Sequence, residues 1–128
     1  MGQSQMFAKT TILVVEDEPL LRMMAVDLVE DAGFEAVEAA NADEAIRILE
    51  CRSDIRVIFT DIDMPGSMDG LLLAAAVRDR WPPIKIILTS GHVHVSELEL
   101  PVDGKFFSKP YDHAQVTRTL QAMASASH

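Results

Sequence analysis

Short apolar runs alternate with segments of helical periodicity along most of this chain. Five runs predict strands, at residues 12–15, 34–39, 57–60, 84–88 and 105–108. The first, third and fourth are almost continuously apolar, which is typical of strands buried on both faces of a parallel sheet. The second run carries Glu35 and Glu38, which predicts that this strand lies at an edge of the sheet.

The segments between and after these strands predict five helices, near residues 19–33, 41–49, 70–81, 93–100 and 112–123. Pro19 opens the first helix, at a position where its missing N–H costs nothing. Helical spacing predicts that its inner face is formed by Leu21, Met24, Ala25 and Leu28. The regular alternation of strands and helices predicts right-handed βαβ units and a single parallel sheet.

The composition narrows the class of protein. The chain has 128 residues, 48% of them apolar, which predicts one domain at residues 11–124 between tails at 1–10 and 125–128. The formal charge of −9 argues against nucleic acid and against anionic membrane surfaces, because both need clustered Lys and Arg. A single cysteine, with neither a secretory leader nor a membrane-length apolar stretch, predicts a cytoplasmic protein.

Polar side chains follow four of the predicted strands where each one ends. They are Glu16 and Asp17 after the first strand, Asp61 after the third, Thr89 after the fourth and Lys109 after the fifth. Ligands bind outside the carboxyl ends of the strands in an open parallel sheet, so we expect these side chains to share one site. Carboxylates can accept a phosphoryl group and bind Mg²⁺, while lysine and threonine can stabilise phosphoryl oxygens.

The same features, in this order, closely resemble the receiver domain of two-component response regulators, from about Thr11 to Met123. The matching motifs are Glu16-Asp17-Glu18-Pro19, Asp61 with Met64-Pro65, Asp69-Gly70, Thr89-Ser90 and Lys109-Pro110. The resemblance implies a flavodoxin-like (βα)5 fold with a doubly wound, five-stranded parallel sheet in the order 2-1-3-4-5. It also implies that a histidine kinase, or a histidine phosphotransfer protein, passes a phosphoryl group to Asp61.

The resemblance also implies further roles, and for the metal ligands Glu16, Asp17 and Asp61 it agrees with the carboxylate chemistry described above. Mg²⁺ would be bound by the side chains of Glu16, Asp17 and Asp61 and by the backbone carbonyl of Asp63. Thr89 and Phe106 would form a switch that changes a face for an unknown downstream protein, for phosphorelay or for a phosphorylation-dependent homodimer. The only chemistry expected is self-phosphorylation and slow autodephosphorylation, so the chain is not expected to be an enzyme.

Some features depart from the family pattern or allow other classes of protein. One extra residue stands in the loop 66–70, and no output domain follows the last predicted helix, which favours a stand-alone receiver. A pseudo-receiver that is never phosphorylated is one alternative, but its usual sign is loss of the acceptor, the acid pair or the lysine. A haloacid-dehalogenase-type phosphatase is another, since Asp61-Ile62-Asp63 matches its Asp-x-Asp core, although that core belongs after the first strand.

Overall fold

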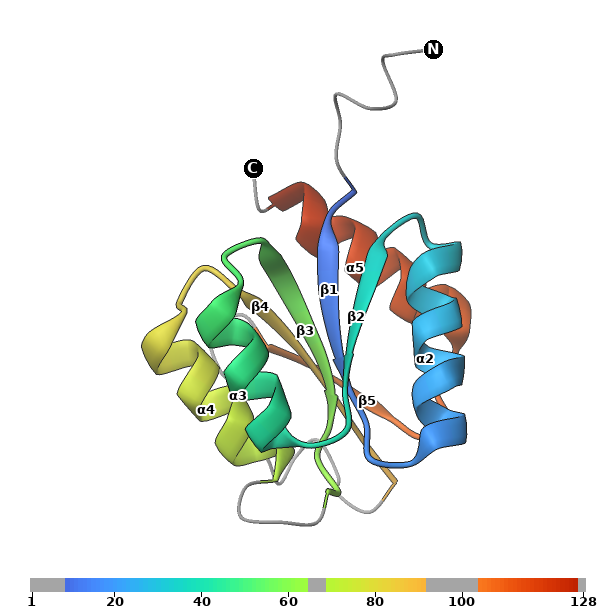
Figure 1. Ribbon diagram of the computed structural model, residues 1–128. Helices are drawn as coiled ribbons and strands as arrows, with labels where there is room; N and C mark the ends of the chain where they lie inside the picture. The colour runs from blue at the N-terminus through green and yellow to red at the C-terminus, as the bar shows by residue number, and fades with distance from the viewer. Residues whose placement is uncertain (1–8, 65–68, 92–103, 127–128) are drawn as a thin grey trace.

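The computed structural model describes residues 9–64, 69–91 and 104–126 (Figure 1). Five parallel strands form one sheet in the order β2-β1-β3-β4-β5, which confirms the predicted fold class. The strands are β1 (Thr11–Val15), β2 (Glu35–Ala39), β3 (Ile55–Asp61), β4 (Lys85–Ser90) and β5 (Gly104–Ser108). The helices are α2 (Pro19–Asp31), α3 (Ala42–Cys51), α4 (Gly70–Arg80) and α5 (His113–Ala126). The helix predicted at 93–100 lies outside the described residues.

Helices cover both faces of the sheet, with α2 and α5 on one side and α3 and α4 on the other (Figure 1). Successive side chains of a strand point to opposite faces. Ile12 and Val14 of β1 therefore join the core under α2 and α5, while Leu13 and Val15 join the core under α3 and α4. Two apolar faces on one strand explain its continuous apolar run. Among the described helices, none is both long and apolar enough to cross a membrane.

Local sequence signals set the ends of the elements. The Asn41 side chain accepts a hydrogen bond from the Glu44 N–H at 2.8 Å and so caps α3, as predicted. Glu44 Oε1 accepts the N–H of Ala40 at 2.6 Å, one residue earlier than in an ideal capping box. Gly33 follows α2 with a φ of 99°, a conformation that favours glycine. These signals account for the turns on either side of the edge strand β2.

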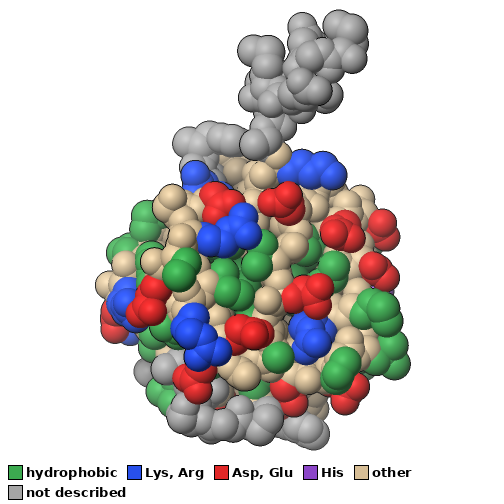
Figure 2. Space-filling model, in the orientation of Figure 1, with side chains coloured by type: hydrophobic (Ala, Val, Ile, Leu, Met, Phe, Trp, Pro, Cys, Tyr) green, Lys and Arg blue, Asp and Glu red, His purple; other side chains and the backbone are tan. Residues whose placement is uncertain are grey.

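The inner face of α2 is only partly as predicted. Ala25 and Leu28 are buried, but Leu21 and Met24 keep 40% and 45% of their surface exposed. Both side chains line an open pocket next to the carboxyl end of the sheet, so helical spacing gave their direction correctly and their burial wrongly. Figure 2 shows hydrophobic side chains gathered over α2, at the right of the view, and charges of both signs spread over the rest of this face.

Candidate functional site

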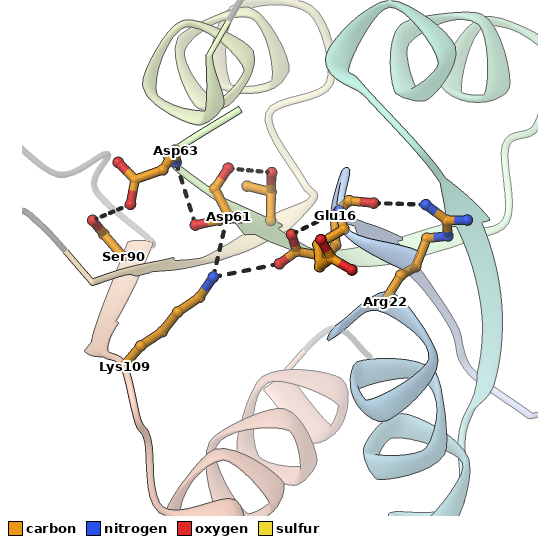
Figure 3. A network of polar contacts seen from close by, with 8 residues as sticks. Glu16, Arg22, Asp61, Asp63, Ser90 and Lys109 are labelled. Atoms are coloured by element: carbon orange, nitrogen blue, oxygen red, sulfur yellow. Dashed lines mark hydrogen bonds and ion pairs between the residues drawn. The ribbon is translucent and has the colours of Figure 1, made fainter. Parts of the chain in front are cut away.

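The sheet register brings the predicted side chains together at the carboxyl ends of the strands (Figure 3). Asp61 is the last residue of β3 and pairs with Thr89 of β4. Glu16 directly follows β1, whose Val15 pairs with Thr60 of β3. The N–H of Lys109 donates to the Ser90 carbonyl at 2.9 Å, which continues the pairing of β4 and β5 past the end of β5. The sequence predicted this convergence, although Asp61 and Thr89 lie within their strands and not after them.

Three carboxylates form a compact cluster in the site. Glu16, Asp17 and Asp61 each offer an oxygen, and these oxygens all lie within 4.8 Å of one another. Glu16 and Asp61 are only 6% and 4% exposed, so water screens their charges poorly. Mg²⁺ is a hard cation that prefers carboxylate oxygens and is usually held by one or two carboxylates plus water and phosphate. The donor set therefore fits such an ion.

Lys109 supplies the compensating positive charge. Its Nζ lies 3.1 Å from Asp61 Oδ2 and 3.5 Å from Glu16 Oε1 (Figure 3). Because both acids are buried, these contacts offset repulsion that would otherwise oppose folding. Lys109 thus contacts two of the three clustered carboxylates directly.

The pKa values reflect this balance. Burial raises the pKa of Asp61 above its ordinary value, and the hydrogen bond from Lys109 only partly offsets that rise. Burial also raises the pKa of Glu16, with the Asp61 charge adding to the effect. For Lys109 burial acts to lower the pKa, but the hydrogen bond and charge of Asp61 outweigh it and the pKa rises. For both acids, burial in the site therefore outweighs the stabilising effect of Lys109 on the charged form.

The backbone around Asp61 is closely packed. The Asp63 N–H donates to Asp61 Oδ1 at 3.3 Å, and the Thr60 hydroxyl donates to the Asp61 carbonyl oxygen at 3.1 Å. Gly70, the first residue of α4, donates its N–H to the Ile62 carbonyl at 3.1 Å. A Cβ on Gly70 would meet the Asp61 carbonyl oxygen, so the helix comes this close only because the residue is glycine.

Thr89 and Phe106, the two residues of the predicted switch, lie on the neighbouring strands β4 and β5. Thr89 is 3% exposed and lines the same pocket as Asp61 and Lys109. Within the part of the chain that the structure describes, its hydroxyl makes no hydrogen bond, so it remains available to a phosphoryl oxygen. Phe106 pairs with Leu88 in the sheet register and is partly buried against the core under α3 and α4. Its part in a switch stays a prediction.

Sequence reasoning assigned no role to two polar residues that support the site, Arg22 and Ser90, although Ser90 stands in the matching Thr89-Ser90 motif. Arg22 donates to the Glu16 carbonyl oxygen at 2.9 Å (Figure 3). It also pairs with Glu38 of β2 at 3.2 Å, which ties the acidic loop to the edge strand. Ser90 donates its hydroxyl to Asp63 Oδ2 at 2.8 Å. The only signals for them are an arginine one turn after the acid pair and a serine beside Thr89, and neither pattern is specific.

A pocket of about 300 Å³ lies beside the cluster, between α2 and the start of α5. Its polar floor contains Asp61, Thr89 and Lys109, while its walls are mainly apolar and include Leu21 and Met24. The site is thus open to solvent or to a partner on the α2 side.

Several known proteins are similar to this chain in sequence and in fold. The chain matches the response regulator receiver domain family over residues 12–121. It is 35% identical to the sensor kinase CckA of Brucella abortus over 117 residues, which is 88% of this chain but 12% of that protein. It is 29% identical to the response regulator receiver protein CpdR of the same organism, covering 91% of this chain and 98% of that protein.

A solved structure agrees with these sequence matches. The response regulator TrrA of Thermotoga maritima, solved in complex with Mg²⁺ and BeF, is 27% identical and superposes with a TM-score of 0.79, covering 89% of this chain and 98% of that chain. Fold, sequence and the arrangement of acids and lysine agree, and this chain belongs to the response regulator receiver domain family, whose members act in two-component signal transduction.

Proposed function

We propose that Asp61 is the residue that accepts the phosphoryl group. The observation that carries this proposal is its place at the end of the central strand β3, buried, in contact with Lys109 and within the carboxylate cluster. In the reaction, an Asp61 carboxylate oxygen forms a bond to phosphorus while the bond from phosphorus to the donor's histidine nitrogen breaks. The electron pair of that bond stays on the imidazole, and the product is an aspartyl phosphate.

Lys109 and Thr89 would hold the transferring group. The phosphoryl group adds about −1.5 to −2 charges and three acceptor oxygens beside Asp61. Lys109 already lies 3.1 Å from an Asp61 oxygen, so its ammonium group needs little movement to pair with a phosphoryl oxygen. The hydroxyl of Thr89, which lines the same pocket, can donate to another phosphoryl oxygen. Both groups are fixed by the ends of strands, which reduces reorganisation during transfer.

Mg²⁺ is the cofactor we propose for this site. Glu16, Asp17 and Asp61 would hold the ion through their carboxylates, and Asp63 through its backbone carbonyl. A bound ion would offset repulsion between the incoming phosphoryl group and the acids. The relative TrrA, solved with Mg²⁺ and BeF, supports this assignment. The donor set and the net charge of −9 also fit a cation better than an anionic partner.

The proposed donor is a histidine kinase or a histidine phosphotransfer protein in the cytoplasm. An exposed apolar patch lies on the first turns of α2 and contains Leu20, Leu21, Met23 and Met24, which are 40–59% exposed. It adjoins the pocket beside Asp61, so a partner helix packed on it would bring a donor side chain to the acceptor. The downstream protein, the switch at Thr89 and Phe106, and a phosphorylation-dependent homodimer remain predictions.

A labelling experiment tests the acceptor. The wild-type protein, incubated with Mg²⁺ and phosphoramidate, should gain a hydroxylamine-sensitive phosphate. Asp61→Asn should lose this label and keep its circular dichroism spectrum, while the matched variant Asp63→Asn should still be labelled. Undiminished labelling of Asp61→Asn would refute the assignment. Steady turnover of a phosphomonoester would instead support the phosphatase alternative, and a folded wild-type protein that never accepts phosphate would support the pseudo-receiver.

A further inference from the structure

Asp63 provides a fourth carboxylate beside the acceptor, and the structure holds it apart from the other three. Its backbone N–H donates to Asp61 Oδ1 at 3.3 Å, so the residue lies against Asp61. Its side chain turns away, and Oδ2 accepts a hydrogen bond from the Ser90 hydroxyl at 2.8 Å (Figure 3). The Asp63 carboxylate is absent from the group of described acidic residues whose oxygens gather within 4.8 Å.

The two residues of this hydrogen bond differ in burial: the donor, Ser90, is buried at the end of a strand, and the acceptor, Asp63, is exposed. Ser90 is 1% exposed, ends β4 and accepts the Lys109 N–H through its carbonyl oxygen at 2.9 Å. Asp63 is exposed and follows the end of β3. An exposed aspartate normally has several rotamers available, and a fixed hydroxyl can select one of them. In Figure 3 the pair lies on one side of Asp61, opposite Glu16 and Arg22.

We propose that Ser90 is a positioning residue that keeps the Asp63 carboxylate out of the metal site. This inference rests on the Mg²⁺ site of the proposed function. With Asp63 held by Ser90, three carboxylates would hold the ion, and a position beside them would stay open for water or a phosphoryl oxygen. With Asp63 released, a fourth carboxylate reaches the cluster, fills that position and adds a charge that repels the phosphodonor.

Ion selectivity follows from the same arrangement. Mg²⁺ accepts six ligands in near-octahedral geometry and keeps several waters, whereas Ca²⁺ takes six to eight oxygen ligands in flexible geometry. An additional carboxylate therefore favours Ca²⁺ more than Mg²⁺. Ser90 thus acts on metal preference as well as on access of the phosphoryl group, through the position of a side chain that is not itself a ligand.

Metal titrations of five proteins test the inference. They are wild type, Ser90→Ala, Asp63→Asn, the double variant of these two, and Asp17→Ala, which removes a carboxylate of the cluster. We expect Ser90→Ala to bind Ca²⁺ about tenfold more tightly in calorimetry, with a smaller gain for Mg²⁺. Its labelling by phosphoramidate should slow. Asp63→Asn should keep its Mg²⁺ affinity within about threefold, because the substitution changes a carboxylate outside the cluster and retains the backbone carbonyl proposed as the ligand. The double variant should show no gain, since no fourth carboxylate remains to be released.

Each contrary result has a distinct meaning. Unchanged Ca²⁺ affinity in folded Ser90→Ala, or a gain that persists in the double variant, overturns the role of Ser90. Asp63→Asn is an exposed change that leaves the core intact, so it gives an independent test even if Ser90→Ala folds poorly. A loss of Mg²⁺ affinity in Asp63→Asn as large as in Asp17→Ala also overturns the role of Ser90. The Asp63 carboxylate would then be a metal ligand already in the wild-type protein. If Asp17→Ala itself leaves Mg²⁺ affinity unchanged, the proposed metal site fails instead.

Discussion

Replacing Gly70 with alanine should damage the site through the backbone alone. A Cβ at this position would meet the Asp61 carbonyl oxygen and would lie 2.7 Å from Ile62 Cα. These are backbone atoms at the end of β3, so no side chain can rotate to make room. The first turn of α4 must therefore move away, and the Gly70 N–H loses its hydrogen bond to the Ile62 carbonyl.

The expected loss in the free energy of unfolding is about 1–3.5 kcal/mol. Overpacking of a filled space costs about 1–3 kcal/mol, and loss of the hydrogen bond adds about 1 kcal/mol. Alanine recovers roughly 0.5–1 kcal/mol through its better helix propensity. Displacement of the Asp61 backbone should also slow phosphorylation, because a shift of about 1 Å in a reacting group can cost about 100-fold in rate.

Urea denaturation followed by circular dichroism measures the first effect, and labelling with phosphoramidate measures the second. Gly91→Ala is the matched control, because Gly91 lies beside the same site and, among the described residues, its Cβ would meet only Lys109 Cβ, at 4.0 Å. We expect its unfolding free energy to stay within about 0.5 kcal/mol of wild type. Equal stability of Gly70→Ala and Gly91→Ala would refute the reasoning.

Three further predictions concern charge, switching and docking. Because the pKa of Asp61 is raised, the free energy of unfolding of the metal-free protein should fall as pH rises from about 4 through the pKa of the folded state. Urea titrations of Asp61→Asn should show a smaller fall in that free energy over the same pH range. Thr89→Ala should still be labelled, but beryllofluoride should shift the NMR signals of Phe106 less than in wild type; equal shifts contradict the coupling. The double variant Leu20→Ser, Met23→Ser should accept phosphate more slowly from a phosphohistidine protein, while its labelling by phosphoramidate stays unchanged. Slower phosphorylation by both donors would contradict a docking role.

Most of the fold and the central cluster followed from the sequence, for a physical reason. Apolar runs that each end in a polar residue, separated by helices, predict a parallel sheet with those residues at one edge. Asp61 and Lys109 meet at 3.1 Å because their strands end at the same edge. Such a prediction needs only the order of elements and the positions where strands stop.

The remaining features depend on contacts that no local pattern encodes. Arg22 and Ser90 act on partners 16 and 27 residues away, Glu38 and Asp63, and the choice among nearby acids is made by side-chain geometry. Leu21 and Met24 show a second limit, because helical spacing predicts which way a side chain points and not whether anything covers it. The loop insertion at 66–70 falls largely outside the described residues, as does the helix predicted at 93–100.

The contact between Glu16 and Lys109 joins residues 93 positions apart, one after the first strand and one after the last. During translation, the acidic residues of the site are therefore synthesised well before Lys109, which contacts them. A nascent chain that ends before Lys109 contains Asp61 but not the ammonium group that this carboxylate contacts at 3.1 Å. The contacts that balance these two buried acids can therefore form only after synthesis has passed β5 and reached Lys109.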